Sequence, residues 1–218
     1  MELILGFDPG GSEGRGRFAW AVAEKTEGLP VRIVATGTKA HAQAAVEAAF
    51  GHVASSDRVI AVGIDSPMYW TPTGEREADQ KLRNILGERG AGSMAGGTVQ
   101  HPNSLRGACV VQGPIAAVLV CRRCPGIPLT ESHPKALLWA LGIASKDLKP
   151  DGIWAKHLSA FVHGAIGDSE DERDAVLGAF AAWGMMTRQR GWTDLVAIED
   201  DPIFFTPGKT EYWFPTAG

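Results

Sequence analysis

Residues 59–67 read VIAVGIDSP, an apolar run that meets a single carboxylate and then stops at a Ser-Pro pair. A continuous apolar run predicts a strand over residues 59–64 that is covered on both faces, as in a parallel sheet. Near the N-terminus the stretch LILGFDPGG does the same at Asp8 and predicts a strand over residues 2–7. Parallel strands of an open α/β sheet end at one edge, where ligands bind, so two strands that end on aspartate predict part of a functional site.

The rest of the chain alternates between short apolar runs and helical patterns. Three further strands are expected, over residues 18–23, 31–36 and 128–131. The first of them joins the N-terminal strand in a hairpin. Helices are expected over residues 40–53, 75–86, 114–122, 135–141, 153–163 and 168–189. This order predicts a mixed α/β sheet with an antiparallel start.

Length and composition predict one domain over residues 1–218. The chain has 218 residues, of which 44 % are hydrophobic and 21 % charged, as is typical of a globular domain. Residues 87–107 are rich in glycine and poor in large apolar groups, which predicts a long loop. Two interpretations of this loop stand side by side: a lid over substrate, or a disordered segment. Residues 200–218, rich in proline and aromatic residues, predict a C-terminal tail packed across the surface.

Charge and hydropathy restrict the location and the partners. No apolar run reaches the roughly 18 residues of a membrane span, and Glu2 stands where a signal peptide carries positive charge, so we expect a cytoplasmic protein without membrane contact. The formal charge of −4 argues against a strong binder of duplex DNA, because neutralising phosphates requires basic side chains. An enzyme that handles a short or transient nucleic-acid substrate remains compatible with this charge.

The three cysteines leave two readings. An odd number of cysteines argues against a disulfide framework. Cys121 and Cys124 form a C-x-x-C pair, and Cys109 with His133 would complete four zinc ligands, although the spacing matches no common zinc pattern. The alternative is plain packing, since Cys121 follows the apolar run IAAVLV of a predicted helix.

Further carboxylates stand where predicted strands end or helices begin. Glu131 ends the strand at 128–131, and Asp171 and Asp174 lie three residues apart on one face of the last predicted helix. Because strand ends at one edge of a parallel sheet converge, Asp8, Asp65 and Glu131 are expected to meet there. A helix packed across that edge would add Asp174.

Clustered carboxylates repel each other unless a positive charge lies among them. Hard divalent cations with oxygen ligands fill this role, and Mg²⁺ takes few carboxylates beside waters and substrate phosphates. The set therefore predicts Mg²⁺ or Mn²⁺ and phosphoryl chemistry, in which two ions clamp the attacking and leaving oxygens. Structural alternatives remain for each acid: Asp8 and Asp65 as turn formers, Glu131 as an ion-pair partner, and Asp171 as a solvated residue of the first helical turn.

Five blocks of the sequence carry a resemblance to a known family. They are GFDPGG…GRFAW at residues 6–20, GIDSP at 63–67, READQKLRNILG at 76–87, TESHPKALLWALG at 130–142 and DERDAVLGAFAAW at 171–183. In this order they resemble the motifs of the DUF429 family, uncharacterised proteins predicted to be nucleases with a ribonuclease H-like fold. The resemblance implies a mixed sheet of five strands, the first three antiparallel, with helices on both sides.

The resemblance also implies a set of site residues. Asp8, Asp65 and Asp174 correspond to its metal ligands, with Asp171 as a further candidate, and Glu131 matches its E-x-H-P block. The D-x-x-D-A motif that starts at Asp171 is similar to the final motif of Holliday-junction resolvases, which share the fold. Those resolvases carry glutamate on the fourth strand, where this chain has the shorter aspartate.

Basic residues near these blocks predict substrate contacts. Arg76 and Arg106 are candidate phosphate ligands, and His133 is a candidate for proton transfer or phosphate binding. Two structural alternatives stand beside these roles. Arg76 lies three residues before Asp79 and can pair with it, and His133 precedes a proline at a helix start, where it can cap or pack.

The predicted function is a divalent-metal-dependent hydrolase, a nuclease or phosphodiesterase, with Asp8, Asp65, Glu131 and Asp174 as its catalytic set. Its partner would be a nucleic acid of unspecified type or a small phosphodiester. A non-catalytic nucleic-acid or nucleotide-binding module that retains the fold is the alternative, and the acidic composition favours it. A kinase or ATPase of the actin and sugar-kinase fold ranks lower, because it needs two domains and a second phosphate loop that the sequence does not contain.

Overall fold

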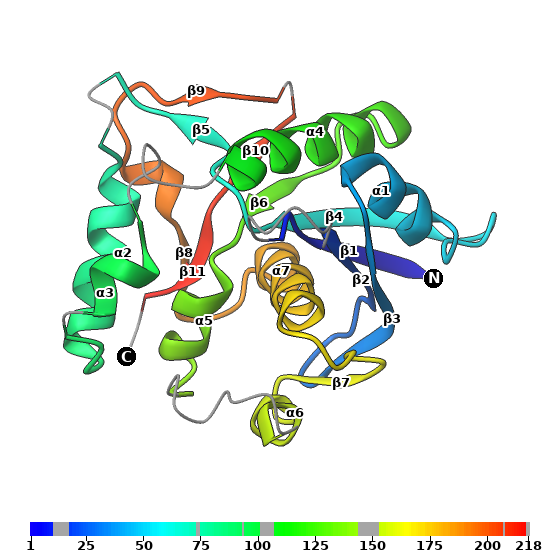
Figure 1. Cartoon of the computed structure of the whole chain (residues 1–218), viewed down its shortest axis with the longest axis horizontal. Helices are drawn as coiled ribbons and strands as arrows, with labels where there is room; N and C mark the ends of the chain where they lie inside the picture. Colours follow the sequence, from blue (N-terminus) through cyan, green and yellow to red (C-terminus); the bar gives the residue numbers. More distant parts are fainter. Residues whose placement is uncertain are drawn as a thin grey trace.

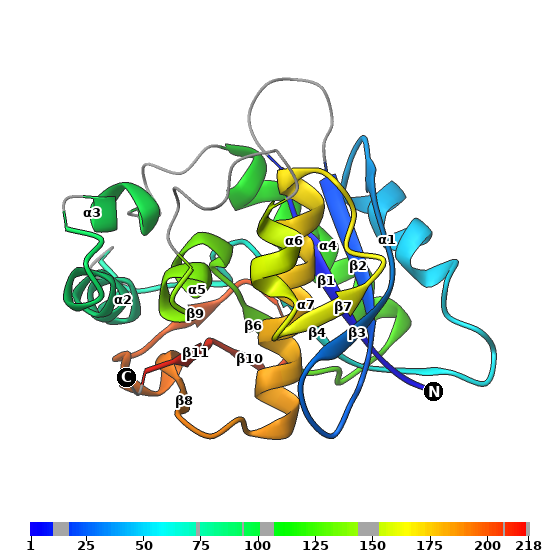
Figure 2. The ribbon, with the colours of Figure 1, turned by 90° about the horizontal axis from the view of Figure 1, so that it is seen from below.

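The chain folds into three layers, with a central sheet between helices (Figures 1 and 2). The structure is a computed structural model that describes residues 1–10, 18–72, 75–92, 94–100, 107–143, 153–206 and 208–216. Helices α1 (Ala42–Phe50) and α4 (Gly107–Arg123) cover one face of the sheet, and α7 (Glu170–Thr187) covers the other. The predicted mixed α/β class is therefore confirmed.

Alternation along the strands builds the two cores. On β1 (Glu2–Asp8), Leu3, Leu5 and Phe7 pack with residues of α1 and α4, whereas Ile4 packs with residues of α7. Successive side chains of a strand point to opposite faces, so an unbroken apolar run feeds both layers. For this reason the unbroken apolar runs before Asp8 and Asp65 indicate strands that are covered on both faces.

Within the described residues the central sheet has seven strands, so the prediction of five was wrong. Their order is β10-β6-β4-β1-β2-β3-β7. The first three strands are antiparallel neighbours as predicted, and β4 and β6 run parallel to β1. The other six strands are β2 (Phe18–Glu24), β3 (Val31–Lys39), β4 (Arg58–Ile64), β6 (Leu129–Glu131), β7 (Val162–Gly164) and β10 (Thr210–Glu211).

One additional strand lies where a helix was expected. The helix predicted over residues 153–163 ends early, as α6 (Ile153–Leu158), and the chain then forms β7, which pairs in parallel with β3 and is the edge strand on that side. Three residues are too few for the period of two to stand out in a sequence. Residues 162–164 form a strand because they pair with β3, and their local sequence pattern does not predict it.

The other additional strand lies in the segment expected as a surface tail, residues 200–218. β10 extends the sheet by pairing with β6, and Tyr212 and Phe214 are almost completely buried. The tail is therefore part of the sheet and the core. The remaining short strands form two ribbons: β5 (Tyr69–Trp70) with β9 (Ile203–Phe204), and β8 (Trp192–Asp194) with β11 (Trp213–Pro215).

The glycine-rich segment 87–107 is not entirely a loop. It contains the short helix α3 (Met94–Thr98), whose Ala95 is buried, while residues 93 and 101–106 lie outside the described part of the chain. Two glycines make this sequence a poor helix former, so packing beside α2 stabilises it. The other helical elements are α2 (Glu77–Glu88), α5 (Pro134–Ala140) and the 3₁₀ turn η3 (Leu195–Ile198).

The backbone of α7 lies directly on β1 and β4. A Cβ atom placed on Gly6 would come 1.9 Å from the carbonyl oxygen of Ala175, and one on Gly63 would come 1.9 Å from that of Gly178. Real Cβ contacts essentially never fall below 3.0 Å, so both positions require glycine. The contact holds the N-terminal half of α7 close to the ends of the two strands.

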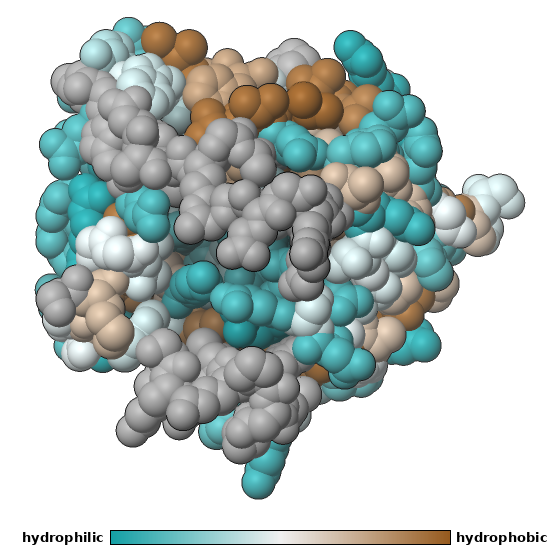
Figure 3. All heavy atoms as spheres, viewed as in Figure 1, coloured by the Kyte–Doolittle hydropathy of each residue, from teal (hydrophilic) through white to brown (hydrophobic). Residues whose placement is uncertain are grey.

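Exposed apolar surface concentrates at one edge of the molecule. Figure 3 shows brown, hydrophobic surface along the upper edge, where β9 and α4 lie, and mostly teal, hydrophilic surface in the middle of the view. Among the described residues, no helix combines the length and the apolar character needed to cross a membrane. The large exposed apolar side chains on α4 and β9 are Val111, Ile115, Ile203 and Phe204.

Replacing Gly6 or Gly63 with alanine is expected to lower the free energy of unfolding by about 3 kcal/mol or more, because the added methyl group overlaps backbone atoms of a packed helix. Gly87→Ala is the matched control: it lies on the exposed side of α2, a Cβ there meets nothing within 4 Å, and alanine is favoured in a helix by about 1 kcal/mol. Urea unfolding monitored by circular dichroism measures all three variants. Similar stabilities of Gly6→Ala and Gly87→Ala would contradict the close contact.

Candidate functional site

The two aspartates at the ends of β1 and β4 are neighbours. Phe7 and Ile64 face each other in the parallel register of these strands, so Asp8 and Asp65 leave the sheet at the same edge. The backbone amide of Asp65 donates a hydrogen bond to the carbonyl oxygen of Phe7, at 2.9 Å. The strand pairing that the apolar runs encode therefore brings these carboxylates together.

The third carboxylate comes from the start of α7. Ser169 caps this helix in a capping box, in which its hydroxyl accepts from the amide of Glu172 and the Glu172 carboxylate accepts from the amide of Ser169. The cap fixes the first turn, and the contact of the helix with Gly6 fixes its height on the sheet. Asp174, one residue before Ala175, is placed by both.

These carboxylates share a cavity of about 420 Å³, a size typical of ligand sites. The predicted residues that it brings together are thus four aspartates from three elements, and His133. Their chemical roles stay predictions. The lining residues are Asp8, Gly10, Asp65, Gly97, Thr98, Gln100, Cys109, His133, Lys135, Glu170, Asp171 and Asp174.

Asp8 is the most strongly perturbed carboxylate of the cavity. Its side chain is buried, with only 7 % of the residue exposed, and it accepts one hydrogen bond, from the amide of Gly10 at 3.0 Å. Burial, together with the charges of Asp65, Asp174 and Asp171, raises the pKa of Asp8 well above its usual range. Among the described residues, the contacts of Asp8 thus compensate its charge only in part.

Asp174 is also buried but has an internal cation. One of its oxygens, Oδ1, accepts hydrogen bonds from Nε and Nη2 of Arg173, at 2.8 and 2.6 Å. Burial nevertheless raises the pKa of Asp174 to about 7, since the attraction of Arg173 is opposed by the charge of Asp65. Arg173 therefore compensates this carboxylate only in part.

His133 and Lys135 bring positive charge to the same cavity. Nδ1 of His133 lies 3.6 Å from Oδ1 of Asp65, and the imidazole makes no hydrogen bond that caps α5. Burial alone would lower the pKa of His133, but the contact with Asp65 and the charges of Asp79 and Glu131 raise it overall. Lys135 is more exposed and pairs with Glu170 at 3.2 Å.

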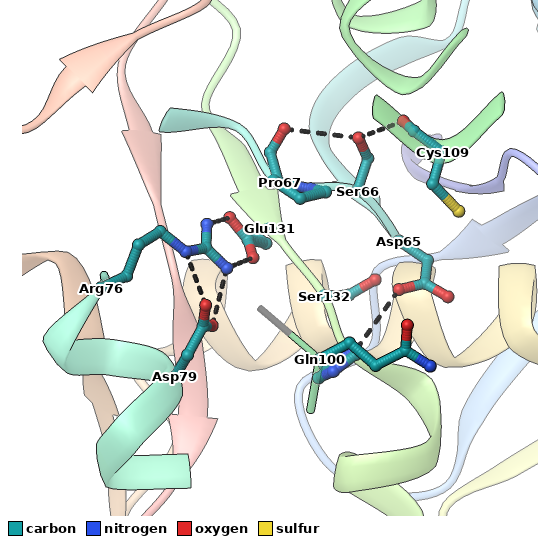
Figure 4. Close-up of a pocket in the computed structure, with 10 residues that line it drawn as sticks. Asp65, Ser66, Pro67, Arg76, Asp79, Gln100, Cys109, Glu131 and Ser132 are labelled. Atoms are coloured by element: carbon teal, nitrogen blue, oxygen red, sulfur yellow. Dashed lines mark hydrogen bonds and ion pairs between the residues drawn. The ribbon is translucent and has the colours of Figure 1, made fainter. Parts of the chain in front are cut away.

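Glu131 and Arg76 do not line the large cavity. They line a smaller adjacent cavity of about 30 Å³, which Asp65 and His133 also line, and there Arg76 binds both Glu131 and Asp79 (Figure 4). Both oxygens of Glu131 accept from the guanidinium, and Arg76 is only 3 % exposed. An open phosphate contact for Arg76 and a place for Glu131 in the carboxylate cluster do not fit this geometry. The structural alternatives, ion pairs, describe both residues.

Arg106 lies outside the described residues, so its predicted phosphate contact has no structural counterpart. None of the three cysteines forms a disulfide. Cys121 and Cys124 pack against the core beneath α1 and α4, in line with the packing alternative. No zinc-ligand group involving them occurs in the part of the chain that the structure describes.

The donor chemistry of the large cavity suits Mg²⁺ or Mn²⁺. Hard divalent cations prefer carboxylate oxygens, and the raised pKa of Asp8 indicates a place where positive charge is favoured. Within the described ranges, no three His, Cys, Asp or Glu side chains come close enough to hold an ion by themselves. Mg²⁺ usually takes only one or two carboxylates and fills its other positions with waters and phosphate oxygens. The residues that could hold such an ion are therefore Asp8 with Asp65, or Asp8 with Asp174.

Polar residues of this region that sequence reasoning missed include Arg173, Lys135 and Gln100. Arg173 stands inside the D-x-x-D-A motif as its single cation, which was a usable signal for a partner of Asp174. Lys135 follows the E-x-H-P block, where its position on the cavity depends on the direction of α5. Gln100 comes from the segment predicted as a loop and carries no local signal.

Comparison with known proteins gives one match. A family model described as "Protein of unknown function (DUF429)" matches residues 7–101. These residues include Asp8 and Asp65, and the match supports the resemblance to this family. The searches of curated proteins and of solved structures gave no match.

Asp174→Asn is expected to become more stable relative to the wild type as the pH rises from about 5 to about 7.5, in protein freed of divalent metal. The pKa of Asp174 is about 7 in the folded protein and 3.8 ordinarily. The folded state therefore binds this proton more tightly than the unfolded chain, and stability is lost as the pH rises between these values, by at most about 1.4 kcal/mol per pH unit. Urea unfolding of both proteins with EDTA measures the effect, and an unchanged difference between them would contradict it.

Proposed function

We propose that this protein is a hydrolase that depends on Mg²⁺ or Mn²⁺ and cleaves phosphodiester bonds, of nucleic acid or of a small phosphodiester, at the cavity lined by Asp8, Asp65 and Asp174. One observation carries the proposal: three carboxylates from distant parts of the chain converge on an open cavity, where two of them have raised pKa values. Repulsion between these carboxylates lowers the stability of the folded protein. Such destabilising arrangements are common at functional sites.

A ribonuclease H-like fold is part of the proposal. The antiparallel strands β1, β2 and β3, followed by the parallel strands β4 and β6 and flanked by helices on both faces, agree with what the resemblance implies. The acids also stand on the corresponding elements, with Asp8 on the first strand, Asp65 after the fourth and Asp174 on the long helix. β7 and β10 are additions at the two edges.

The residues of the cavity have separable roles in this proposal. Asp8, Asp65 and Asp174 are the residues that would hold the cation. A bound divalent cation would supply charge neutralisation and lower the pKa of a bound water. His133, whose pKa is raised by its contact with Asp65, would donate a proton to a leaving oxygen. Lys135 attracts the phosphate into the cavity.

One exposed region of the described residues is unsuited to phosphate. The large exposed side chains Val111, Ile115, Ile203 and Phe204 of α4 and β9 are apolar, and a phosphate backbone is held by cations and hydrogen-bond donors. The proposal therefore does not use this apolar region for substrate.

A second candidate function is a non-catalytic module that binds a nucleic acid or nucleotide. The contact between Arg173 and Asp174, at 2.6 Å, favours it, because an internal cation already occupies part of the place that a metal ion would take. Binding of nucleic acid without hydrolysis, and without any effect of chelator, would support this candidate over the hydrolase.

Mn²⁺ or Mg²⁺ at millimolar concentration is expected to raise the melting temperature of the wild type, because a ligand that binds only the folded state stabilises it by about 2.7 kcal/mol at 100 times its dissociation constant. EDTA should reverse the rise, and Asp8→Asn and Asp65→Asn should abolish it. Glu88→Gln, a carboxylate exposed at the end of α2, is the control that keeps the rise. Equal shifts in all four proteins would exclude this cavity as the metal site.

Hydrolysis is expected in a panel of single-stranded, duplex and branched DNA, RNA and small phosphodiesters, with Mn²⁺ or Mg²⁺ present. Asp8→Asn should lower the rate by about 100-fold or more, as loss of one preorganised charged group commonly does. Glu88→Gln serves again as the control. Activity that Asp8→Asn leaves intact would reject the assignment of the site, even if the protein proved to be a nuclease.

A further inference from the structure

Asp65 stands at the start of a turn, residues 65–68, that connects β4 to β5. The turn is held at its entry by the main chain of β1 and in its middle by Ser66, whose hydroxyl donates to the carbonyl oxygen of Cys109 at 2.7 Å. Its exit is held by a side chain, since the amide of Met68 donates to Oε2 of Glu131 at 3.0 Å. One buried carboxylate therefore anchors the segment that presents Asp65.

Glu131 is suited to this anchoring by its place in the sheet. It is the last residue of β6 and faces Ile64, the residue before Asp65, in the parallel register of β4 and β6. It is only 3 % exposed and does not line the large cavity. Its oxygens accept from Arg76 at 2.7 and 2.8 Å (Figure 4). Oε2 also accepts from the Met68 amide. A side chain so occupied has little capacity left for a metal ion.

Arg76 holds the Glu131 carboxylate in place and opposes the effect of burial on its pKa. Burial raises the pKa of Glu131, and the contact with Arg76 opposes this rise. The guanidinium also donates to both oxygens of Asp79, at 2.7 and 2.8 Å, and lies 4.7 Å from the centre of the Tyr69 ring. Tyr69 directly follows Met68, so Arg76 packs on the exit of the turn while it binds the carboxylate that anchors it.

We propose that Arg76 and Glu131 are positioning residues for Asp65: they fix the exit of the turn, and through it the direction of the Asp65 carboxylate, without touching metal or substrate. The proposal rests on the proposed function of the large cavity as a metal site. Partners that orient a metal ligand from outside commonly change metal affinity or activity by about 10- to 100-fold when they are replaced. Asp79 differs from Glu131, because it binds Arg76 but makes no contact with the turn among the hydrogen bonds of the described residues.

The test compares Glu131→Gln with Asp79→Asn as its matched control. Each removes one charge from the partners of Arg76, but only the first disturbs the anchor of Met68. Calorimetric titration with Mn²⁺ is expected to show about 10-fold or more weaker binding for Glu131→Gln and a change of less than about 3-fold for Asp79→Asn. Urea unfolding of both variants establishes that the titrated protein is folded. Equal weakening in the two variants, or none in Glu131→Gln, would overturn the proposal.

A second readout separates this proposal from the proposed function. Amide hydrogen exchange at Met68, measured by NMR without metal, is expected to be faster in Glu131→Gln than in Asp79→Asn, because only there does the amide lose its carboxylate acceptor. Arg76→Lys, which keeps the charge but not the paired contacts, should show the same direction. If the wild type binds no Mn²⁺, the proposed function fails, while exchange at Met68 still decides whether Glu131 holds the turn. If the exchange rate of the Met68 amide were unchanged in Glu131→Gln and in Arg76→Lys, the positioning role would be overturned.

Discussion

The backbone of α7 lies in direct contact with β1 and β4, and the placement of the remaining parts follows from that contact. Gly6 and Gly63 permit it, because any side chain there would overlap the main chain of the helix. Residues Arg173 to Met185 of α7 are buried, so the helix serves as the centre of the core on its side of the sheet. The contact also brings Asp174 to the strand ends, and a packing constraint thereby becomes a constraint on the site.

Two groups of buried charge lie close together in this fold and differ in how they are compensated. In one, Arg76 binds both oxygens of Asp79 and of Glu131, so each carboxylate has a cation at hydrogen-bond distance. In the other, Asp8 accepts from the amide of Gly10 and lies, among the described residues, near the like charges of Asp65, Asp174 and Asp171. A compensated group stabilises a local arrangement, whereas an uncompensated one is poised to bind a cation. The turn at residues 65–68 joins the two groups.

Much of this arrangement could be predicted from local patterns. The apolar runs before Asp8 and Asp65 identified two central strands, and the hairpin and the long helix followed from equally clear patterns. The proximity of Asp8 and Asp65 followed from one rule, that parallel strands end at a common edge. The short strands β7 and β10 escaped prediction because two or three residues carry no period, and a pairing partner far along the chain stabilises them.

Glu131 and Asp65 show where sequence and tertiary structure divide. In the sequence they are alike: each ends an apolar run and is followed by serine. The sequence by itself determined that both acids stand at the ends of strands, because an apolar run and the point where it stops are local properties. Only the tertiary structure decided that Arg76, 55 residues away, reaches Glu131, while Asp65 faces an open cavity. Charge compensation depends on distances through space, and the order of residues along the chain does not contain them.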